Sequence, residues 1–168
     1  SPYLDGYLTF DGKGDFLRTD DHAALEFPSN STDSFSIECN FKVSSPNKPM
    51  YILGKRQSAG WIIGYSNNES GYISICINNE WKRIYYLGAD TNWHSYKVKY
   101  SKPDQKLETF VDRELTNTYN NFTYLSLADN SAFSVGNVGF PAIYGIHTAN
   151  LNSLWFKGSI AYLKICSN

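Results

Sequence analysis

The sequence predicts an all-β protein built from two antiparallel sheets, and two neighbouring segments support this fold class most clearly. Tyr96, Val98 and Tyr100 alternate with polar residues, which is the period of a half-buried strand and not of a helix. A polar turn at residues 101–106 stops that strand, and apolar residues resume at 107–111. The acidic-basic pair that follows indicates a further turn into a third strand.

Strand signals recur at short spacing along the whole chain, whereas the one short helical candidate is residues 20–26. The expected strands cover residues 7–10, 16–19, 35–43, 50–55, 61–65, 72–77, 81–87, 94–100, 107–111, 132–135 and 158–166. So many short strands separated by turn residues predict a two-sheet jelly-roll sandwich.

Two of these strands show clear alternation. Apolar side chains at every second position of 35–43 point one way and polar ones the other. Ile73, Ile75 and Ile77 alternate in the same manner, and Asn78-Asn79 then leads into the next strand. Because asparagine tolerates a positive φ, this pair predicts a tight hairpin turn.

Length and charge limit the classes of function. The 168 residues fit one domain, expected to span 1–168, and the formal net charge of −1 gives no electrostatic case for nucleic acid or an anionic membrane. No apolar run approaches the roughly 18 residues of a membrane span. Aromatic residues make up 16% of the chain, and 13 of them are tyrosines, which suits both a sandwich core and a sugar-stacking surface.

The chain ends and the cysteines add two expectations. Ser1-Pro2-Tyr3-Leu4 shows neither a start methionine nor a signal peptide, so we expect a module of a larger protein. Cys39 and Cys76 lie in apolar strands and are expected to be buried as small hydrophobic residues. Cys166 ends the last strand, and the sequence does not say whether it forms a disulfide.

Four segments carry a family resemblance. Residues 8–17 (LTFDGKGDFL) read as an opening strand with a Gly-Asp turn, and residues 33–42 (DSFSIECNFK) as the next strand. Residues 93–113 read as a central hairpin, and FSVG at 133–136 with FKGSI at 156–160 as closing strands. In this order and spacing they resemble laminin-G-like, concanavalin A-like jelly-roll domains over about residues 7–166.

The resemblance implies two face-packed antiparallel sheets used mostly for binding sugars or proteins. It also implies a structural Ca²⁺ where the first loop meets the last strand. Asp11 and Asp15 would supply hard carboxylate oxygens there. The alternative is that both are simply turn residues, because the acidic residue that the family carries just after Ile160 is replaced here by Ala161 and Tyr162.

Two candidate sugar sites follow from the aromatic residues. The first is an aromatic face on neighbouring strands, in which flat rings would stack on sugar faces: Trp61, Tyr65, Trp81, Arg83 and Tyr85. Whether Trp61 and Trp81 lie in the core or at the surface is left open, whereas Trp93 is expected in the core at the family's structural tryptophan position. The second is the long loop before the last strand, with Tyr144, His147, Asn150, Asn152 and Trp155.

Catalysis is not expected. Glycan hydrolases of this architecture need two carboxylates about 5 Å apart for retaining chemistry. The glutamates of this chain are scattered, and no recognisable nucleophile or metal spacing accompanies its histidines.

The sequence therefore predicts a secreted or surface-displayed, non-catalytic carbohydrate-binding module. Its expected partners are a polysaccharide or glycoconjugate and other domains of a parent protein. The alternative is a protein-binding adhesion or structural domain without a sugar ligand. An exposed set of aromatic rings beside polar side chains would favour the first, and an exposed apolar patch the second.

Overall fold

The computed structural model describes residues 6–19, 34–56, 60–65, 71–77, 79–123, 133–136 and 154–167. Within these ranges the regular structure is entirely strand. The strands are β1 (Leu8–Asp11), β2 (Leu17–Arg18), β3 (Phe35–Val43), β4 (Met50–Arg56), β5 (Gly60–Tyr65), β6 (Tyr72–Ile77), β7 (Glu80–Tyr86), β8 (His94–Ser101), β9 (Lys106–Val111), β10 (Glu114–Tyr119), β11 (Phe133–Val135) and β12 (Lys157–Ser167).

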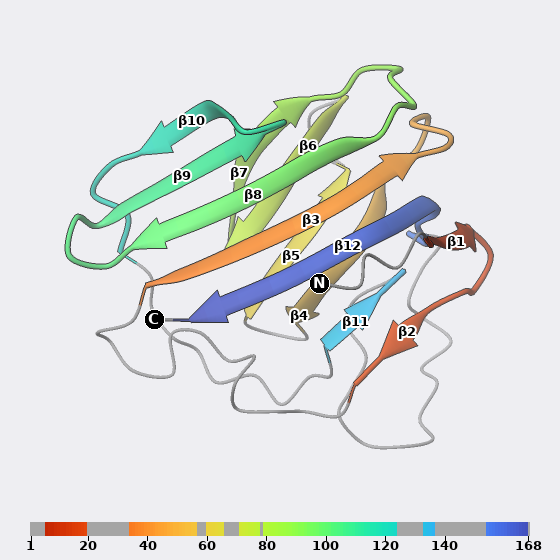
Figure 1. The fold of residues 1–168 in the computed structure, drawn as a ribbon, viewed down its shortest axis with the longest axis horizontal. Coiled ribbons are helices and arrows are strands. Elements are labelled where there is room, and N and C mark those ends of the chain that lie inside the picture. The colour runs from red at the N-terminus through yellow and green to blue at the C-terminus, as the bar shows by residue number, and fades with distance from the viewer. Residues whose placement is uncertain are drawn as a thin grey trace.

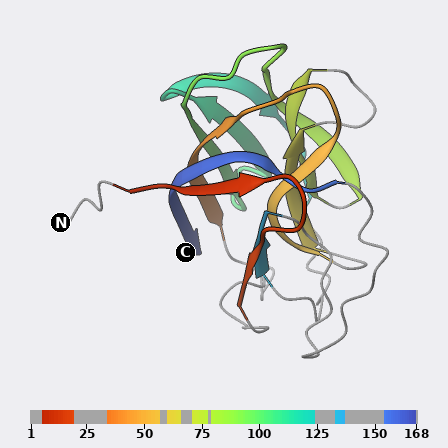
Figure 2. The ribbon, with the colours of Figure 1, turned by 90° about the vertical axis from the view of Figure 1, so that its right-hand side faces the viewer.

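The strands form two six-stranded antiparallel sheets. Sheet A has the order β1-β12-β3-β8-β9-β10, and sheet B the order β2-β11-β4-β5-β6-β7. Sheet A lies in front of sheet B in Figure 1, and the two layers are seen from the side in Figure 2. β12, the last strand in the sequence, lies between β1 and β3 in sheet A and pairs with both. This arrangement confirms the jelly-roll sandwich expected from the sequence.

The core fills the space between the sheets and follows the period of two. Every second residue of β3 is buried, and so are Tyr96, Val98 and Tyr100 of β8. Tyr96 stacks on Phe41 with ring centroids 4.1 Å apart. The side chains between them point to the outer face of sheet A, where the polar residues collect.

One edge of the sandwich is closed by hydrogen bonds between the two sheets. The side-chain amide of Asn117 in β10 donates to the carbonyl oxygens of Arg83 and Ile84 in β7, both at 3.1 Å. The Tyr119 hydroxyl donates to the Arg83 carbonyl at 2.9 Å. These bonds satisfy backbone groups that the edge strand β7 would otherwise leave open.

Several local expectations are confirmed. Asn79 has φ 60° in the turn between β6 and β7. Cys39 and Cys76 are buried, and all three cysteines, Cys166 included, are free thiols. The helical candidate at 20–26 lies outside the described residues. None of the described segments forms a helix that could cross a membrane.

Candidate functional site

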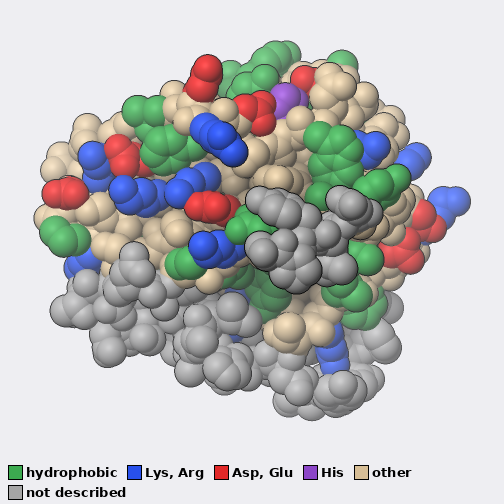
Figure 3. Space-filling model, in the orientation of Figure 1, with side chains coloured by type: hydrophobic (Ala, Val, Ile, Leu, Met, Phe, Trp, Pro, Cys, Tyr) green, Lys and Arg blue, Asp and Glu red, His purple; other side chains and the backbone are tan. Residues whose placement is uncertain are grey.

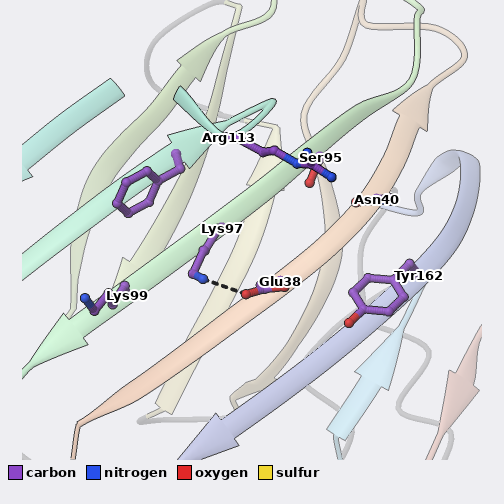
Figure 4. Close-up of a pocket in the computed structure, with 8 residues that line it drawn as sticks. Glu38, Asn40, Ser95, Lys97, Lys99, Arg113 and Tyr162 are labelled. Atoms are coloured by element: carbon purple, nitrogen blue, oxygen red, sulfur yellow. Dashed lines mark ion pairs between the residues drawn. The ribbon is translucent and has the colours of Figure 1, made fainter. Parts of the chain in front are cut away.

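A groove of about 630 Å³ crosses the outer face of sheet A. It is lined by Glu38, Asn40, Ser95, Lys97, Lys99, Phe110, Arg113 and Tyr162. These residues come from β12, β3, β8, β9 and the turn after β9 (Figure 4). We call this feature the sheet A groove.

The strand register places six of the eight groove residues in two rows. Tyr162, Asn40 and Ser95 face one another across β12, β3 and β8. Two residues further along, Glu38 faces Lys97, which in turn faces Phe110 of β9. Since adjacent strands are about 4.8 Å apart and alternate residues about 7 Å apart, the two rows form a patch on the scale of a few sugar rings.

A β-bulge determines the position of Tyr162. Ile160 pairs with Phe41 and Tyr162 with Asn40, so Ala161 is an extra residue in β12. In a regular strand without a bulge, residues 160 and 162 would share a face, and Tyr162 would point into the core like Ile160. The bulge instead turns the ring to the outer face, where it is 44% exposed. Bulges commonly re-aim a side chain in this way.

The groove combines an aromatic ring with groups that can form hydrogen bonds and with several charges. The Lys97 ammonium is 2.6 Å from the Glu38 carboxylate. Lys and Arg side chains gather over this face, with acidic side chains among them (Figure 3). Figure 4 shows the Arg113 side chain reaching across β8 toward Ser95. The groove can therefore both stack against a flat ligand and donate hydrogen bonds to it.

Arg113 is held at the groove by a tight turn. Asp112 and Arg113 have φ 51° and 72°, as the two central residues of a type I′ hairpin turn require. The Asp112 carboxylate accepts a hydrogen bond from the Ser95 amide at 2.9 Å, and the Asp112 amide donates to the Ser95 carbonyl at 2.8 Å. These bonds fasten the turn to β8 beside the groove.

His94 connects the same turn to the loop before β8. Its Nδ1 is 2.7 Å from Asp112 Oδ2, and its Nε2 is 3.1 Å from Asp90 Oδ2. Only the protonated ring can donate from both nitrogens. Partial burial lowers the pKa of His94, but the bonds to Asp112 and Asp90 outweigh burial and raise this pKa above its usual value.

The pKa values of the two carboxylates shift in the matching direction. The backbone amide of Asn92 and the ring of His94 lower the pKa of Asp90. Desolvation opposes the shift at Asp112, yet the bonds from Ser95 and His94 lower its pKa as well. The three groups therefore form a charged clamp, His94–Asp90–Asp112, that stabilises the Arg113 turn at pH values where all three are ionised.

Two residues of the predicted aromatic face are in the core. Trp61 is 1% exposed, and Tyr65 is buried with its hydroxyl donating to the Pro46 carbonyl at 3.0 Å. Both belong to β5, whose odd-numbered side chains point between the sheets together with Ile63. The prediction that Trp61 and Tyr65 bind a ligand at the surface is therefore wrong.

A second bulge, in β7, turns the other three residues of the predicted aromatic face, Trp81, Arg83 and Tyr85, to different sides of sheet B. Tyr85 pairs with Ile73 and Arg83 with Ser74, so Ile84 is the extra residue in β7. Trp81 and Arg83 stay on the outer face of sheet B, whereas Tyr85 packs against the core. The expectation that Trp81, Arg83 and Tyr85 share one face is thus wrong for Tyr85.

Trp81 is 37% exposed, and the rings around it contact one another. Its ring stacks near that of Tyr51, with centroids 6.4 Å apart. The Arg83 guanidinium lies 4.4 Å from the centroid of the Tyr72 ring, which also contacts Tyr86. These aromatic rings and Arg83 therefore contact one another on the outer face of sheet B.

Trp93 is at the surface and not in the core. It is 39% exposed, its ring meets the edge of Tyr7 at 5.6 Å, and the Lys42 ammonium lies 5.4 Å from its centroid. The alternation of Tyr96, Val98 and Tyr100 already turns odd-numbered positions outward. That signal was in the sequence, and the family resemblance pointed the other way.

Of the predicted loop site, Tyr144, His147, Asn150 and Asn152 lie outside the described residues. Trp155 is described and half-buried, with its ring 6.0 Å from that of Phe16. The loop site remains a prediction.

The predicted calcium ligands, Asp11 and Asp15, accept hydrogen bonds from backbone amides of their own loop. Asp15 Oδ2 accepts from the Asp11 amide at 3.0 Å, and Asp11 Oδ1 accepts from the Lys13 amide at 2.7 Å. Ca²⁺ takes 6–8 oxygen ligands. Across the described ranges no group of three or more Asp, Glu, His or Cys side chains is arranged so that it could hold a metal ion. A site here would need backbone carbonyls or residues beyond those ranges, so calcium also remains a prediction.

The glutamates considered for hydrolysis are largely engaged by lysines. Glu38 pairs with Lys97, Glu80 with Lys82 and Glu108 with Lys106. They lie on three different strands. This placement does not resemble a pair of hydrolytic carboxylates on one strand.

The sequence did not predict the groove. Tyr162 departs from the family pattern, and Asn40, Ser95 and Lys97 belong to the polar sides of two strands. The available signal was the juxtaposition of the polar faces of 35–43 and 94–100, which pair directly in the structure. No residue in the sequence around Ala161 indicates the bulge.

Comparison with solved structures supports the fold. The chain is similar to a heptameric SAP-like pentraxin from Limulus polyphemus, with 14% identity, a TM-score of 0.63, and coverage of 95% of this chain and 74% of that one. It is similar to mouse laminin alpha1 chain domains LG4-5, with 12% identity, a TM-score of 0.59, and coverage of 97% and 42%.

A third similar structure is the CBM40 of Ruminococcus gnavus IT-sialidase, with 11% identity, a TM-score of 0.59, and coverage of 90% of this chain and 89% of that one. No family model and no curated protein sequence matches the chain. At these identities the likeness concerns the fold alone. The protein has the jelly-roll fold of laminin-G-like, concanavalin A-like domains.

Proposed function

We propose that this protein is a non-catalytic glycan-binding domain and that the sheet A groove is its binding site. The observation that carries the proposal is the exposed Tyr162 ring beside Asn40 and Ser95 in an open groove of about 630 Å³. A ligand site of this kind needs an apolar surface and a few placed polar groups. Tyrosine supplies both in one rigid side chain.

The similar structures support the class of function. One is described as a sialidase CBM40, and another as a putative carbohydrate binding protein from Bacteroides ovatus, with a TM-score of 0.65 and 15% identity. The proposal for this chain rests on the groove, and these neighbours make a glycan the first ligand to test. A secreted or surface location and a parent protein with further domains belong to the same proposal.

A second candidate function is protein binding. An apolar hollow of about 480 Å³ lies beside β1. Its lining includes Tyr7, Leu8, Leu17, Val135 and Ile160, and also Tyr162, which lines the sheet A groove as well. Tyr7, Leu8 and Leu17 are exposed. Exposed apolar patches of this kind often mark protein contacts. This hollow favours the adhesion alternative.

The test is binding of the purified domain to a glycan array, followed by affinity measurements on the best ligand. Tyr162→Ala should weaken binding by about 1–3 kcal/mol, as expected for a central aromatic contact. Tyr86→Ala is the matched control, because Tyr86 is also an exposed tyrosine but lies on the outer face of sheet B. Equal affinity of both variants would remove the groove as the site. A second panel of extracellular proteins would then test the apolar hollow.

A further inference from the structure

The sheet A groove carries more positive than negative charge. Lys97, Lys99 and Arg113 line it, against the single carboxylate of Glu38. We propose that the groove selects glycan chains that bear anionic groups, carboxylate or sulfate, over neutral ones. This inference rests on the proposed glycan-binding function and names the ligand class of the same site.

Two of the three cations are available to a ligand. Lys97 is paired with Glu38, but in the part of the chain that the structure describes Lys99 and Arg113 form no ion pair. Glu108 is the cross-strand neighbour of Lys99, and its carboxylate is 3.1 Å from Lys106. Asp112, next to Arg113, is bonded to His94. The nearby acidic groups are therefore engaged elsewhere.

The cations follow the length of β8. Lys97 and Lys99 are two residues apart on the same face, about 7 Å along the strand. Arg113 reaches β8 at Ser95, one further step in the same direction (Figure 4). A row of cations with Tyr162 and Asn40 alongside suits a chain with repeated anionic groups better than a single small anion. Arginine adds two parallel donors for a carboxylate or sulfate.

A change at Glu38 should affect the binding of acidic and neutral glycans in opposite directions. The Glu38 carboxylate forms an ion pair with the Lys97 ammonium at 2.6 Å. An anionic ligand must therefore compete with Glu38 for that ammonium. Removing the charge of Glu38 should therefore strengthen binding of acidic glycans. A groove that binds neutral sugars would lose a charged acceptor by the same change, since glutamine keeps only one neutral acceptor oxygen, and would bind more weakly.

The net charge of −1 does not argue against this local preference. Fields of exposed charges are screened over about 8–10 Å at moderate salt, so the groove acts through the charges that line it. The interaction is consequently expected to weaken with salt. Raising salt from about 0.1 M to about 1 M shortens the screening length from about 10 Å to about 3 Å.

The experiment compares matched ligands by calorimetry. Hyaluronate oligosaccharides are measured against their carboxyl-reduced, neutral form, and chondroitin sulfate oligosaccharides against their desulfated and carboxyl-reduced, neutral form. The acidic member of at least one pair should bind more tightly, and this advantage should disappear at high salt. Polyglutamate serves as a polyanion without sugar and should bind more weakly than the acidic glycan.

Substitutions of single charged residues test whether the groove is responsible for the preference for acidic glycans. Lys99→Gln and Arg113→Gln should each weaken binding of the acidic glycan by about two- to fivefold, the range of exposed charge pairs. Glu38→Gln should strengthen it. Lys48→Gln is the control, since Lys48 is exposed and does not line the groove. Loss of the same size in Lys48→Gln would show a nonspecific charge effect and overturn the inference.

The outcomes separate the two proposals. Equal affinity for acidic and neutral members of both pairs, with Tyr162→Ala still weakening both, overturns the anionic preference and keeps the glycan site. Binding of polyglutamate as tight as that of the acidic glycans also overturns it. Absence of binding to every glycan of the array overturns the proposed function itself.

Discussion

Tyr162 of β12 lies directly opposite Asn40 of β3, because the extra residue Ala161 shifts the register of β12 by one position. This pairing brings an exposed aromatic ring to the polar face of sheet A. The binding surface thus depends on one backbone irregularity in an otherwise regular sheet. The same irregularity leaves Ile160 and Leu163 facing inward on either side.

The two tryptophans weighed for the predicted aromatic face should respond differently to truncation. Trp61→Ala removes a ring that is 1% exposed and should lower the free energy of unfolding by about 3–5 kcal/mol. Trp81→Ala loses mainly its stacking on Tyr51 and should cost about 1 kcal/mol. Denaturant unfolding of both variants checks this. A larger loss for Trp81→Ala than for Trp61→Ala would contradict the placement of both.

The alternation of side chains made most of the fold predictable. β3 was expected with the bounds it has, because its burial alternates with a period of two. β6 was expected with its bounds from the alternating isoleucines of its sequence, although both of its faces are largely buried. The strand after the Asp112-Arg113 turn was expected without bounds, since Glu114–Tyr119 forms the edge of sheet A and buries little of either face.

The site was less predictable because it depends on bulges. An extra residue at Ala161 turns Tyr162 outward, and one at Ile84 turns Tyr85 inward. Neither position carries a glycine or another residue that marks a bulge in the sequence. Trp93 involves no bulge. It was expected in the core at the family's structural tryptophan position, and that prediction is wrong, because the alternation of Tyr96, Val98 and Tyr100 turns odd-numbered positions outward.

The His94–Asp90–Asp112 clamp predicts a pH optimum of stability. The raised pKa of His94 means that its contribution is complete below the unfolded value of about 6.5 and is lost as pH rises through the higher folded value. The lowered pKa values of Asp90 and Asp112 mean that their contribution is present above about 3.9 and is lost as pH falls.

Stability should therefore be greatest between about pH 4 and pH 6.5 and fall on the alkaline side. In His94→Gln that alkaline fall should be reduced relative to the parent protein. Denaturant midpoints measured across this pH range check it. Parallel pH profiles of the two proteins would show that His94 is not protonated in the clamp.

The sheet-to-sheet bonds of Asn117 should contribute to stability. Asn117→Ala removes the donor to the Arg83 and Ile84 carbonyls and should cost about 1–2 kcal/mol. Asn120→Ala, an exposed asparagine in the turn after β10, should change stability by less than about 0.5 kcal/mol. Similar losses in both variants would mean that the bridge between β10 and β7 adds nothing measurable.

The calcium prediction for Asp11 and Asp15 is tested by thermal melting. A bound ion should stabilise the protein by about 2.7 kcal/mol at one hundred times its dissociation constant. Asp15→Asn should remove this increase. An unchanged Tm between chelator and millimolar calcium would leave both carboxylates with the role that their hydrogen bonds show, which is closing the loop between β1 and β2.

The most direct test of the glycan site is an NMR titration of the labelled domain with its best glycan ligand. We expect amide shift changes concentrated at Asn40, Ser95, Lys97 and Arg113, which line the sheet A groove and not the apolar hollow, with little change around Trp81. Changes centred on Trp81 and Tyr51 instead, or on the apolar hollow beside β1, would contradict the assignment of the sheet A groove.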